Sequence, residues 1–361
     1  MSYSVPLFSK SAVDKAGRAL ASTKSVDEFD EAAWDVLGNW RASHAFPLNT
    51  ITVSLKGKVN RLGLKAVVVQ RLKRSRSILS KLSRDSMRLT QMQDIGGCRA
   101  VVPSIEDVYT LRDKFYKSRS KHILISEDDY IASPKASGYR GIHLIYKFQS
   151  EVKSEYNNLL LEVQLRSQVQ HAWATAVETV GAVVGQALKS SQGESMWLSY
   201  FQTASVAFEY TETPAFGRTP HMSRGLVARE LEKLHTKLDV TKKLTAYRAA
   251  LRATETPTAK NAGYFLLVLL PDEPGLQVFS FAKEEADAAQ KEYQRYERLL
   301  PFQSRQVPLF PELADYSGAQ VVLVGAESFR SIREAYPNYY LDTEKFVSLV
   351  THFIQRYRRS A

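Results

Sequence analysis

The segment Leu159-Leu160-Leu161-Glu162-Val163-Gln164-Leu165-Arg166 alternates apolar and polar side chains over its last six residues. A two-residue period is that of a β-strand, in which successive side chains point to opposite faces of a sheet. Leu161, Val163 and Leu165 form the apolar face, and three polar side chains form the other. A polar face of this kind is unusual in a buried sheet, so we expect it either to meet solvent or to floor a site.

The same patterns predict further strands and helices on both sides of this segment. Strands are expected over 98–102, 122–126, 142–148, 264–270, 276–281 and 321–325. Helices are expected over 10–42, 50–70, 105–116, 168–190, 195–210, 224–252, 284–299, 328–335 and 342–357, and 71–92 is expected to alternate between loop and helix. Strands and helices mix up to residue 190, and helices follow. We therefore expect an α+β fold whose sheet is flanked by helices, with a C-terminal helical segment and a small α/β domain.

The length and the two Pro/Gly-containing breaks, at 212–224 and 254–263, divide the chain. At about 150 residues per domain, 361 residues suggest two domains. We predict an N-terminal helical segment over 1–45, the main α+β domain over 46–211, a linker and helical segment over 212–262, and a small α/β domain of unknown role over 263–361.

The composition excludes several classes of protein. A single cysteine, Cys98, excludes a disulfide framework and a cysteine-rich zinc site. No window approaches the roughly 18 uninterrupted apolar residues of a membrane helix. Charged side chains within the first 20 residues argue against a signal-peptide core. We therefore expect a soluble, cytoplasmic protein with no membrane partner.

The net charge of +11 is concentrated in one patch. Residues 56–88 hold 11 basic side chains and one acidic side chain, which gives +10 in 33 residues. Such a patch is typical of a partner that carries phosphate: nucleic acid, a nucleotide or an anionic lipid.

Familiar phosphate loops and hydrolase motifs are missing from the sequence, so side-chain cations and an ion must hold any phosphate. In Arg71-x-Lys73-x-x-x-Ser77-x-x-x-Lys81 the four-residue spacing would place Lys73, Ser77 and Lys81 on one helical face. Two ammonium groups and a hydroxyl suit a polyphosphate. A solvated basic helix face is the alternative, which the shortage of acidic residues weakens.

Three further motifs could carry chemistry. Asp94 precedes the strand that contains Arg99, and a carboxylate at a strand edge can hold Mg²⁺, although an isolated Asp in a turn is usually a cap. The loop 129–143 displays Lys135, Tyr139 and His143. If Tyr139 is exposed in this basic loop, it can stack on a base; the alternative is that Tyr139 packs in the core. The polar face of 162–166 is followed by His171 and by Trp173, which we expect in the core.

Together these motifs resemble the RelA/SpoT synthetase family. The resemblance is carried by RLKRSRSILSKL (71–82), DIGGCRAVV (94–102), DDYIASPKASGYRGIHL (128–144) and EVQLRSQVQHAWATAVE (162–178), and it covers about residues 40–210. It identifies 46–211 as a synthetase domain and implies a nucleotidyltransferase-like mixed sheet. Gly141 and Cys98 depart from the residues usual at these positions, but neither change removes a group that the reaction needs.

The resemblance implies a reaction and a set of roles. Family members transfer the β,γ-pyrophosphate of ATP to the 3′-hydroxyl of GDP or GTP, make ppGpp or pppGpp, release AMP and use Mg²⁺. By motif position, Asp94 and Glu162 are the implied catalytic carboxylates and Mg²⁺ ligands. The implied ATP-binding residues are Arg71, Lys73, Ser77, Lys81 and Arg99, of which the two arginines would sandwich the adenine. The implied acceptor residues are Lys135, Tyr139, His143, Gln164 and His171, with Tyr139 stacked on the guanine.

Other readings stay open. Some toxic members of the family pyrophosphorylate the 3′-CCA end of tRNA, and the C-terminal domain would then be a fused antitoxin or sensor. A non-catalytic RNA-binding module is the alternative of another class, although carboxylates in a basic cleft give a pure binder no advantage. We expect no hydrolase activity, because no His-Asp dipeptide occurs and only about 45 residues precede the synthetase region. Small synthetases often form homo-oligomers, and the composition does not decide this.

Overall fold

The computed structural model describes residues 3–22, 30–184, 195–212, 222–238, 240–241, 244, 262–270, 275–299, 320–325 and 343–360. Its main sheet has five strands in the order β1-β2-β5-β4-β3. The strands are β1 (Val67–Leu72), β2 (Gly96–Val102), β3 (Ile123–Asp129), β4 (Ile142–Lys147) and β5 (Leu160–Ser167). β2 and β5 run parallel and the other neighbours run antiparallel, so the expected mixed α+β fold is confirmed.

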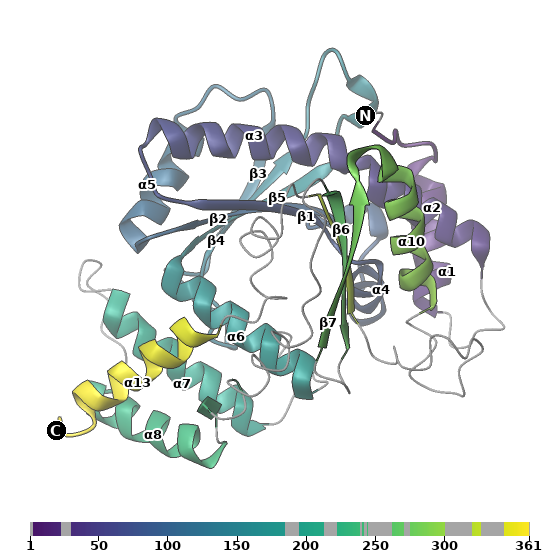
Figure 1. Ribbon diagram of the computed structural model, residues 1–361. Helices are drawn as coiled ribbons and strands as arrows, with labels where there is room; N and C mark the ends of the chain where they lie inside the picture. Colours follow the sequence, from purple (N-terminus) through teal and green to yellow (C-terminus); the bar gives the residue numbers. More distant parts are fainter. Residues whose placement is uncertain are drawn as a thin grey trace.

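The central strand β5 separates the core from the site. Leu161, Val163 and Leu165 are fully buried and share one core with α3 (Ala45–Arg61) and α5 (Ile105–Tyr116). Figure 1 shows α3 and α5 over one face of the sheet and α6 (Gln168–Val184) on the other side. The polar side chains of β5 point away from the α3–α5 core, so they floor a site rather than meeting bulk solvent.

The N-terminal helix expected over 10–42 is two helices. They are α1 (Lys10–Ser22) and α2 (Glu31–Ser43), and α1 packs against both α2 and α4 (Ser75–Arg84). The carboxylate of Asp30 accepts a hydrogen bond from the backbone N–H of Ala33 and so caps the start of α2.

The helix predicted over 50–70 is wrong at its C-terminal end. α3 ends at Arg61, and Gly63 follows with a φ of +65°, a conformation that glycine adopts at helix ends without steric cost. The run Val67-Val68-Val69 then forms β1, as its β-branched side chains favour. Lys73 therefore lies in the turn before α4, and the prediction that Lys73, Ser77 and Lys81 share one helical face is also wrong.

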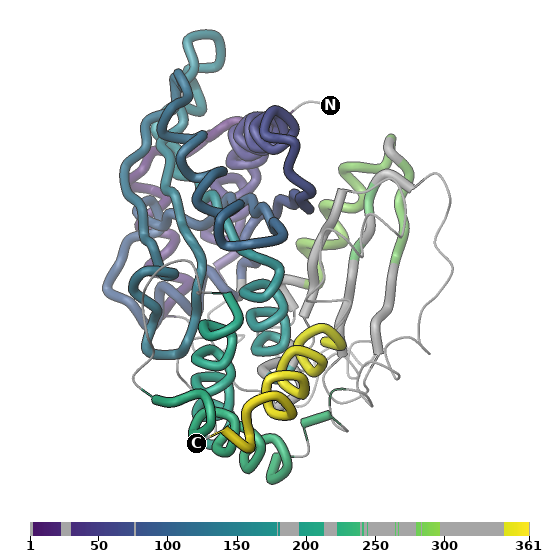
Figure 2. The backbone as a smooth tube through the Cα atoms, turned by 90° about the vertical axis from the view of Figure 1, so that its left-hand side faces the viewer, coloured from purple at the N-terminus to yellow at the C-terminus, as the bar shows by residue number. Residues whose placement is uncertain are grey.

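A second core joins four helices below the sheet. α6 packs with α7 (Ser195–Glu212), α8 (Arg224–Lys237) and α13 (Glu344–Tyr357) around Trp173, Phe201, Phe346 and Phe353. Figure 2 shows α13, the last helix of the chain, side by side with α7 and α8. The rest of the helix predicted over 224–252, and the end of that predicted over 168–190, lie largely outside the described residues.

A second sheet of three antiparallel strands forms from the C-terminal part, in the order β7-β6-β8. Its strands are β6 (Ala262–Leu270), β7 (Gly275–Ala282) and β8 (Gln320–Gly325), and α10 (Ala286–Leu299) packs against them. The helix predicted over 328–335 lies outside the described residues, and the domain boundaries at 45, 211 and 262 stay predictions. Within the described ranges, no helix combines the length and the apolar character that crossing a bilayer requires.

Candidate active site

A cleft of about 240 Å³ opens over the polar face of β5 and brings together most of the predicted site residues. Those that line it are Arg71, Lys73, Asp94, Arg99, Lys135, Tyr139, His143, Glu162 and Gln164. Lys81 reaches the same region through Asp94. Ser77, on α4, does not line the cleft, and His171, on α6, lines a separate pocket together with Arg99.

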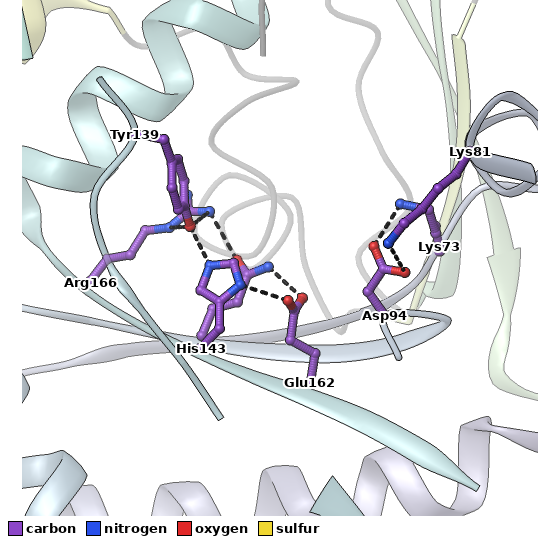
Figure 3. Close-up of polar contacts among 8 residues, drawn as sticks. Lys73, Lys81, Asp94, Tyr139, His143, Glu162 and Arg166 are labelled. Carbon is purple, nitrogen blue, oxygen red and sulfur yellow. Dashed lines mark hydrogen bonds and ion pairs between the residues drawn. The ribbon is translucent and has the colours of Figure 1, made fainter. Parts of the chain in front are cut away.

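Asp94 holds the two lysines of the basic motif. Nζ of Lys73 lies 2.9 Å from Oδ2 of Asp94, and Nζ of Lys81 lies 3.3 Å from Oδ1 (Figure 3). Burial lowers the pKa of Lys73, and the charge of Asp94 opposes that effect. The lysines thus converge as expected, but from the turn after β1 and from α4 rather than from a single helix.

Glu162 is held from its own strand and from the neighbouring one. Its Oε1 lies 2.8 Å from Nδ1 of His143 on β4, and its Oε2 accepts a 2.6 Å hydrogen bond from the amide of Gln164. Burial raises the pKa of Glu162, but the charge and hydrogen bond of His143 outweigh burial and bring that pKa to about 2. The carboxylate is therefore ionised at neutral pH.

Tyr139 ends a chain of hydrogen bonds that begins at Glu162 (Figure 3). Its phenolic oxygen lies 2.5 Å from Nε2 of His143 and accepts a 2.9 Å hydrogen bond from Nη2 of Arg166. Burial raises the pKa of Tyr139, but Arg166 and His143 outweigh burial and bring it to about 8. Burial lowers the pKa of His143, whereas Tyr139 and Glu162 raise it to about 9. The imidazole is thus protonated at neutral pH and donates in both directions.

The ring of Tyr139 is also in contact with cations. The guanidinium of Arg166 lies 5.0 Å from the ring centroid, and the ammonium of Lys135 lies 5.5 Å from it. The ring of Trp173 meets it edge-on at 6.4 Å. A purine that stacks on Tyr139 must share the ring with these cations or displace them.

The cleft carries more positive than negative charge. Arg71, Lys73, Arg99, Lys135 and Arg166 line it together with only two carboxylates, Asp94 and Glu162, which leaves +3 before His143 is counted. Burial, followed by the charges of Arg166 and Arg71, lowers the pKa of Arg99. Nε of Arg99 and Nη1 of Arg166 are buried without a hydrogen-bond partner among the described residues. A ligand rich in phosphate oxygens would satisfy both the charge and these donors.

The sequence predictions assigned no role to Arg166 or Trp173, yet both line the cleft. The alternation along β5 had already placed Arg166 beside Glu162 and Gln164, and that signal could have found it. Trp173 is buried, as expected, and its indole N–H donates to the carbonyl of Phe201. Glu178 on α6 lies 3.7 Å from the guanidinium of Arg74.

The two carboxylates of the cleft suit Mg²⁺ only if substrate phosphates supply further oxygen ligands. No cluster of three or more His, Cys, Asp or Glu side chains suited to a metal occurs in the described part of the chain. Mg²⁺ is commonly bound by one or two carboxylates together with substrate phosphates, and Asp94 and Glu162 supply the hard oxygen atoms that it prefers. The metal would have to replace the lysines on Asp94.

Comparison with known proteins gives matches to part of the chain. Residues 70–180 match a family model described as the region found in RelA / SpoT proteins. Two curated relatives are the GTP pyrophosphokinases YjbM and YwaC of Bacillus subtilis (strain 168). They are 33% and 29% identical over 111 residues, which are 30% and 29% of this chain and 52% of each relative. The chain thus spans about half the length of these relatives.

Solved structures of small alarmone synthetases from Bacillus subtilis are also similar. Synthetase 1 bound to its product pppGpp is 25% identical, with a TM-score of 0.41 over 47% of this chain and 89% of that chain. Synthetase 2 is 20% identical, with a TM-score of 0.43 over 50% of this chain and 96% of that chain.

Proposed function

We propose that the chain is a GTP pyrophosphokinase, on the premise that residues 70–180 match the region found in RelA/SpoT proteins. It transfers the β,γ-pyrophosphate of ATP to the 3′-hydroxyl of GDP or GTP. The observation that carries the proposal is the cleft itself, in which five cations surround two carboxylates on the polar face of β5. The excess of positive charge on the described residues that line the cleft suits two polyphosphate substrates. The two carboxylates suit a metal-assisted transfer.

On the donor side, the basic motif binds the ATP phosphates. Lys73 and Lys81 already converge on the Asp94 carboxylate, within 2.9 and 3.3 Å of its oxygens. Lys73 and Lys81 would pair with the phosphate oxygens of a bound triphosphate, and Asp94 would then be able to hold Mg²⁺. Arg71 and Arg99 offer planar guanidinium groups, which suit both phosphate and the face of an adenine ring.

On the acceptor side, the hydrogen-bonded chain from Tyr139 through His143 to Glu162 positions the guanosine. The 3′-oxygen attacks the β-phosphorus of ATP, the bond from that phosphorus to the α,β-bridging oxygen breaks, and AMP leaves. We assign the hydroxyl proton to Glu162, which must first release Gln164 or His143 to accept it. Asp94 and Glu162 would hold Mg²⁺, which would supply positive charge that stabilises the transferring pyrophosphoryl group.

The test is a transfer assay with γ-labelled ATP, Mg²⁺ and either GDP, GTP or deacylated tRNA. We expect label on the guanine nucleotide and a loss of at least about a hundredfold in rate for Asp94→Asn and Glu162→Gln, as for removal of a charge that stabilises a transition state. Asp85→Asn is the matched control, because Asp85 pairs with Arg84 on the surface of the same region. Label found only on tRNA would show that the acceptor is tRNA and not a guanine nucleotide. Unchanged transfer rates in both variants would show that Asp94 and Glu162 have no role in the reaction.

A regulatory role for the C-terminal part rests on a different contact. Nη2 of Arg41 donates to the hydroxyl of Tyr293 on α10 at 2.8 Å, and Nε of Arg41 donates to the backbone carbonyl of Lys73 at 2.7 Å. The segment with α10 is thus connected to a phosphate-binding lysine through one side chain. We propose that this part acts as a fused neutraliser or sensor. The assay tests it, because Tyr293→Phe should change the transfer rate without removing any cleft residue.

A further inference from the structure

A second cationic groove runs along α3 and past the C-terminal end of α5. Figure 1 shows these two helices on the opposite side of the main sheet from α6. The cavity volume of the groove is about 650 Å³, and the groove shares no lining residue with the cleft. Six cations line it: Lys58, Arg61, Lys114, Lys117, Arg119 and Lys121. Among the described residues that line it, Glu151 is the only acid, and it pairs with Lys121 at 2.8 Å.

Lys58 is the unusual member of this group because it is only 5% exposed. Its ammonium donates to Oγ of Ser54 at 2.8 Å and lies 4.6 Å from the ring centroid of Phe115. In the described part of the chain, no carboxylate forms a salt bridge with it. An ammonium group has three donors, and a buried charge without a counterion is strongly destabilising. Burial, followed by the charges of Arg61 and Lys114, lowers the pKa of Lys58, which reflects the crowding of cations.

Helix ends account for only part of this charge. Lys58 and Arg61 lie in the last turn of α3 and Lys114 in the last turn of α5, where cations favourably meet the helix dipole. Each helix C-terminus is equivalent to about half a negative charge. Six cations less one carboxylate and about one charge from two helix ends leave about +4. This excess is larger than dipole compensation requires.

We infer that this groove is a second anion site, which binds the polyphosphate group of a nucleotide or of an inorganic polyphosphate. Its volume lies in the range of small-ligand pockets, about 300–1,000 Å³. The hydroxyl group of Ser150 also lines the groove. It accepts a hydrogen bond from the backbone N–H of Lys153, and its own proton can donate to a phosphate oxygen. A nucleic-acid strand would instead meet the exposed Arg119 and Lys121 and leave the buried Lys58 without a counterion.

Calorimetric titration of the full chain with inorganic tripolyphosphate tests the inference. We expect Lys58→Met to weaken binding at the groove at least about tenfold while the protein stays folded, because methionine keeps the apolar stem and removes the buried charge. The double variant Lys114→Ala/Lys117→Ala should weaken it similarly and does not depend on the buried position. Lys15→Ala/Arg18→Ala is the matched control, since it removes two exposed cations from α1. The variant Lys73→Ala distinguishes the two sites, because Lys73 lines the cleft and not the groove.

Further titrations identify the source of the phosphates. Tighter binding of ATP or GTP than of tripolyphosphate would indicate a nucleotide, and equal affinity would indicate the phosphates alone. Unchanged tripolyphosphate affinity in both groove variants would overturn the inference. So would binding of an unstructured RNA 20-mer that depends on Arg119 and Lys121 in the absence of tripolyphosphate binding. Because the readout is binding at residues outside the cleft, failure here leaves the proposed transferase activity untouched.

Discussion

At the scale of single residues, His143 connects the two ends of the acceptor side. Its imidazole lies between the Glu162 carboxylate and the Tyr139 hydroxyl, and these two neighbours raise its pKa to about 9 against the effect of burial. Glu162→Gln should therefore lower the pKa of His143 towards its ordinary value of 6.5. Nuclear magnetic resonance of the imidazole nitrogens measures this pKa directly.

His44 serves as the internal control for that measurement. It is buried at the end of α2, and burial lowers its pKa to about 4 in a part of the chain that Glu162 does not touch. A His143 pKa that is the same in the wild type and the variant would contradict the assigned role of Glu162.

The same pair predicts how stability depends on pH. The folded-state pKa of His143 is raised from 6.5 to about 9, so its contribution is complete below pH 6.5 and is lost as pH rises through 9. The folded-state pKa of Glu162 is lowered from 4.5 to about 2, so its contribution is complete above pH 4.5 and is lost as pH falls towards 2. The difference in unfolding free energy between the wild type and Glu162→Gln should be largest between pH 4.5 and 6.5. Urea denaturation at several pH values checks this, and a pH-independent difference would refute it.

Gly138 fixes the loop that presents Lys135 and Tyr139. Its φ is +90°, and a Cβ there would lie 2.9 Å from Cβ of Ser205 and 3.3 Å from the ring of Trp173. Gly138→Ala should therefore cost more than the roughly 1–2 kcal/mol of a left-handed conformation alone. Gly63→Ala is the matched control, since its φ is +65° but a Cβ there meets nothing within 4 Å. Equal losses of unfolding free energy in the two variants would show that the contact of Gly138 with α7 is unimportant.

At the scale of elements, the sequence located four of the five strands of the main sheet. It missed β1, most of which was predicted as the end of a helix, and it predicted one helix where α1 and α2 are two. The helix Ile105–Tyr116 agrees with the helix predicted over 105–116. The end of α3 does not agree with the prediction, because a short apolar run fits the helix period and the strand period equally well. Gly63 and the valine run 67–69 nevertheless indicated that a helix ends and a strand begins here. Most of the predicted site residues still converge, since the turn after β1 places Lys73 beside Asp94. Contacts such as Arg166 with Tyr139 depend on the register of β4 with β5, which local patterns do not specify.

The contact between α2 and α10 is a second element-scale feature that local patterns could not reveal. Arg41 and Tyr293 are 252 residues apart and both are buried. Tyr293→Phe removes the acceptor of a charged donor and should lower the unfolding free energy by about 1.5–3 kcal/mol. Arg41→Met should cost more, because the Lys73 carbonyl also loses its donor. Chemical denaturation of both single variants and of the double variant measures the coupling.

An exposed residue of the same helix controls for non-specific effects on α10. Arg295 pairs with Glu292 on the surface, so Arg295→Ala should change stability by less than about 0.5 kcal/mol. Additive losses in the Arg41→Met/Tyr293→Phe double variant would mean that the two side chains do not act together.

At the scale of the whole molecule, two separate cores flank the cleft. The sheet core holds β2, β4 and β5 with α3 and α5, and the helical core holds α6, α7, α8 and α13. Trp173 belongs to the helical core and also lines the cleft. The last helix of the chain therefore supports the wall of a site whose motifs lie before residue 180.

This arrangement makes Phe353 of α13 a test of long-range support. Its side chain is fully buried and its ring stacks on Tyr210 at 6.3 Å. Phe353→Ala should cost about 3–5 kcal/mol through lost burial and the cavity left behind. Amide hydrogen exchange should then accelerate in α7 and α8 while β2 and β5 keep their protection, because the cores are distinct. Gln355→Ala, an exposed change in the same helix, should leave exchange unaltered. Equal acceleration in the strands of the main sheet would instead mean that the two cores unfold as one cooperative unit.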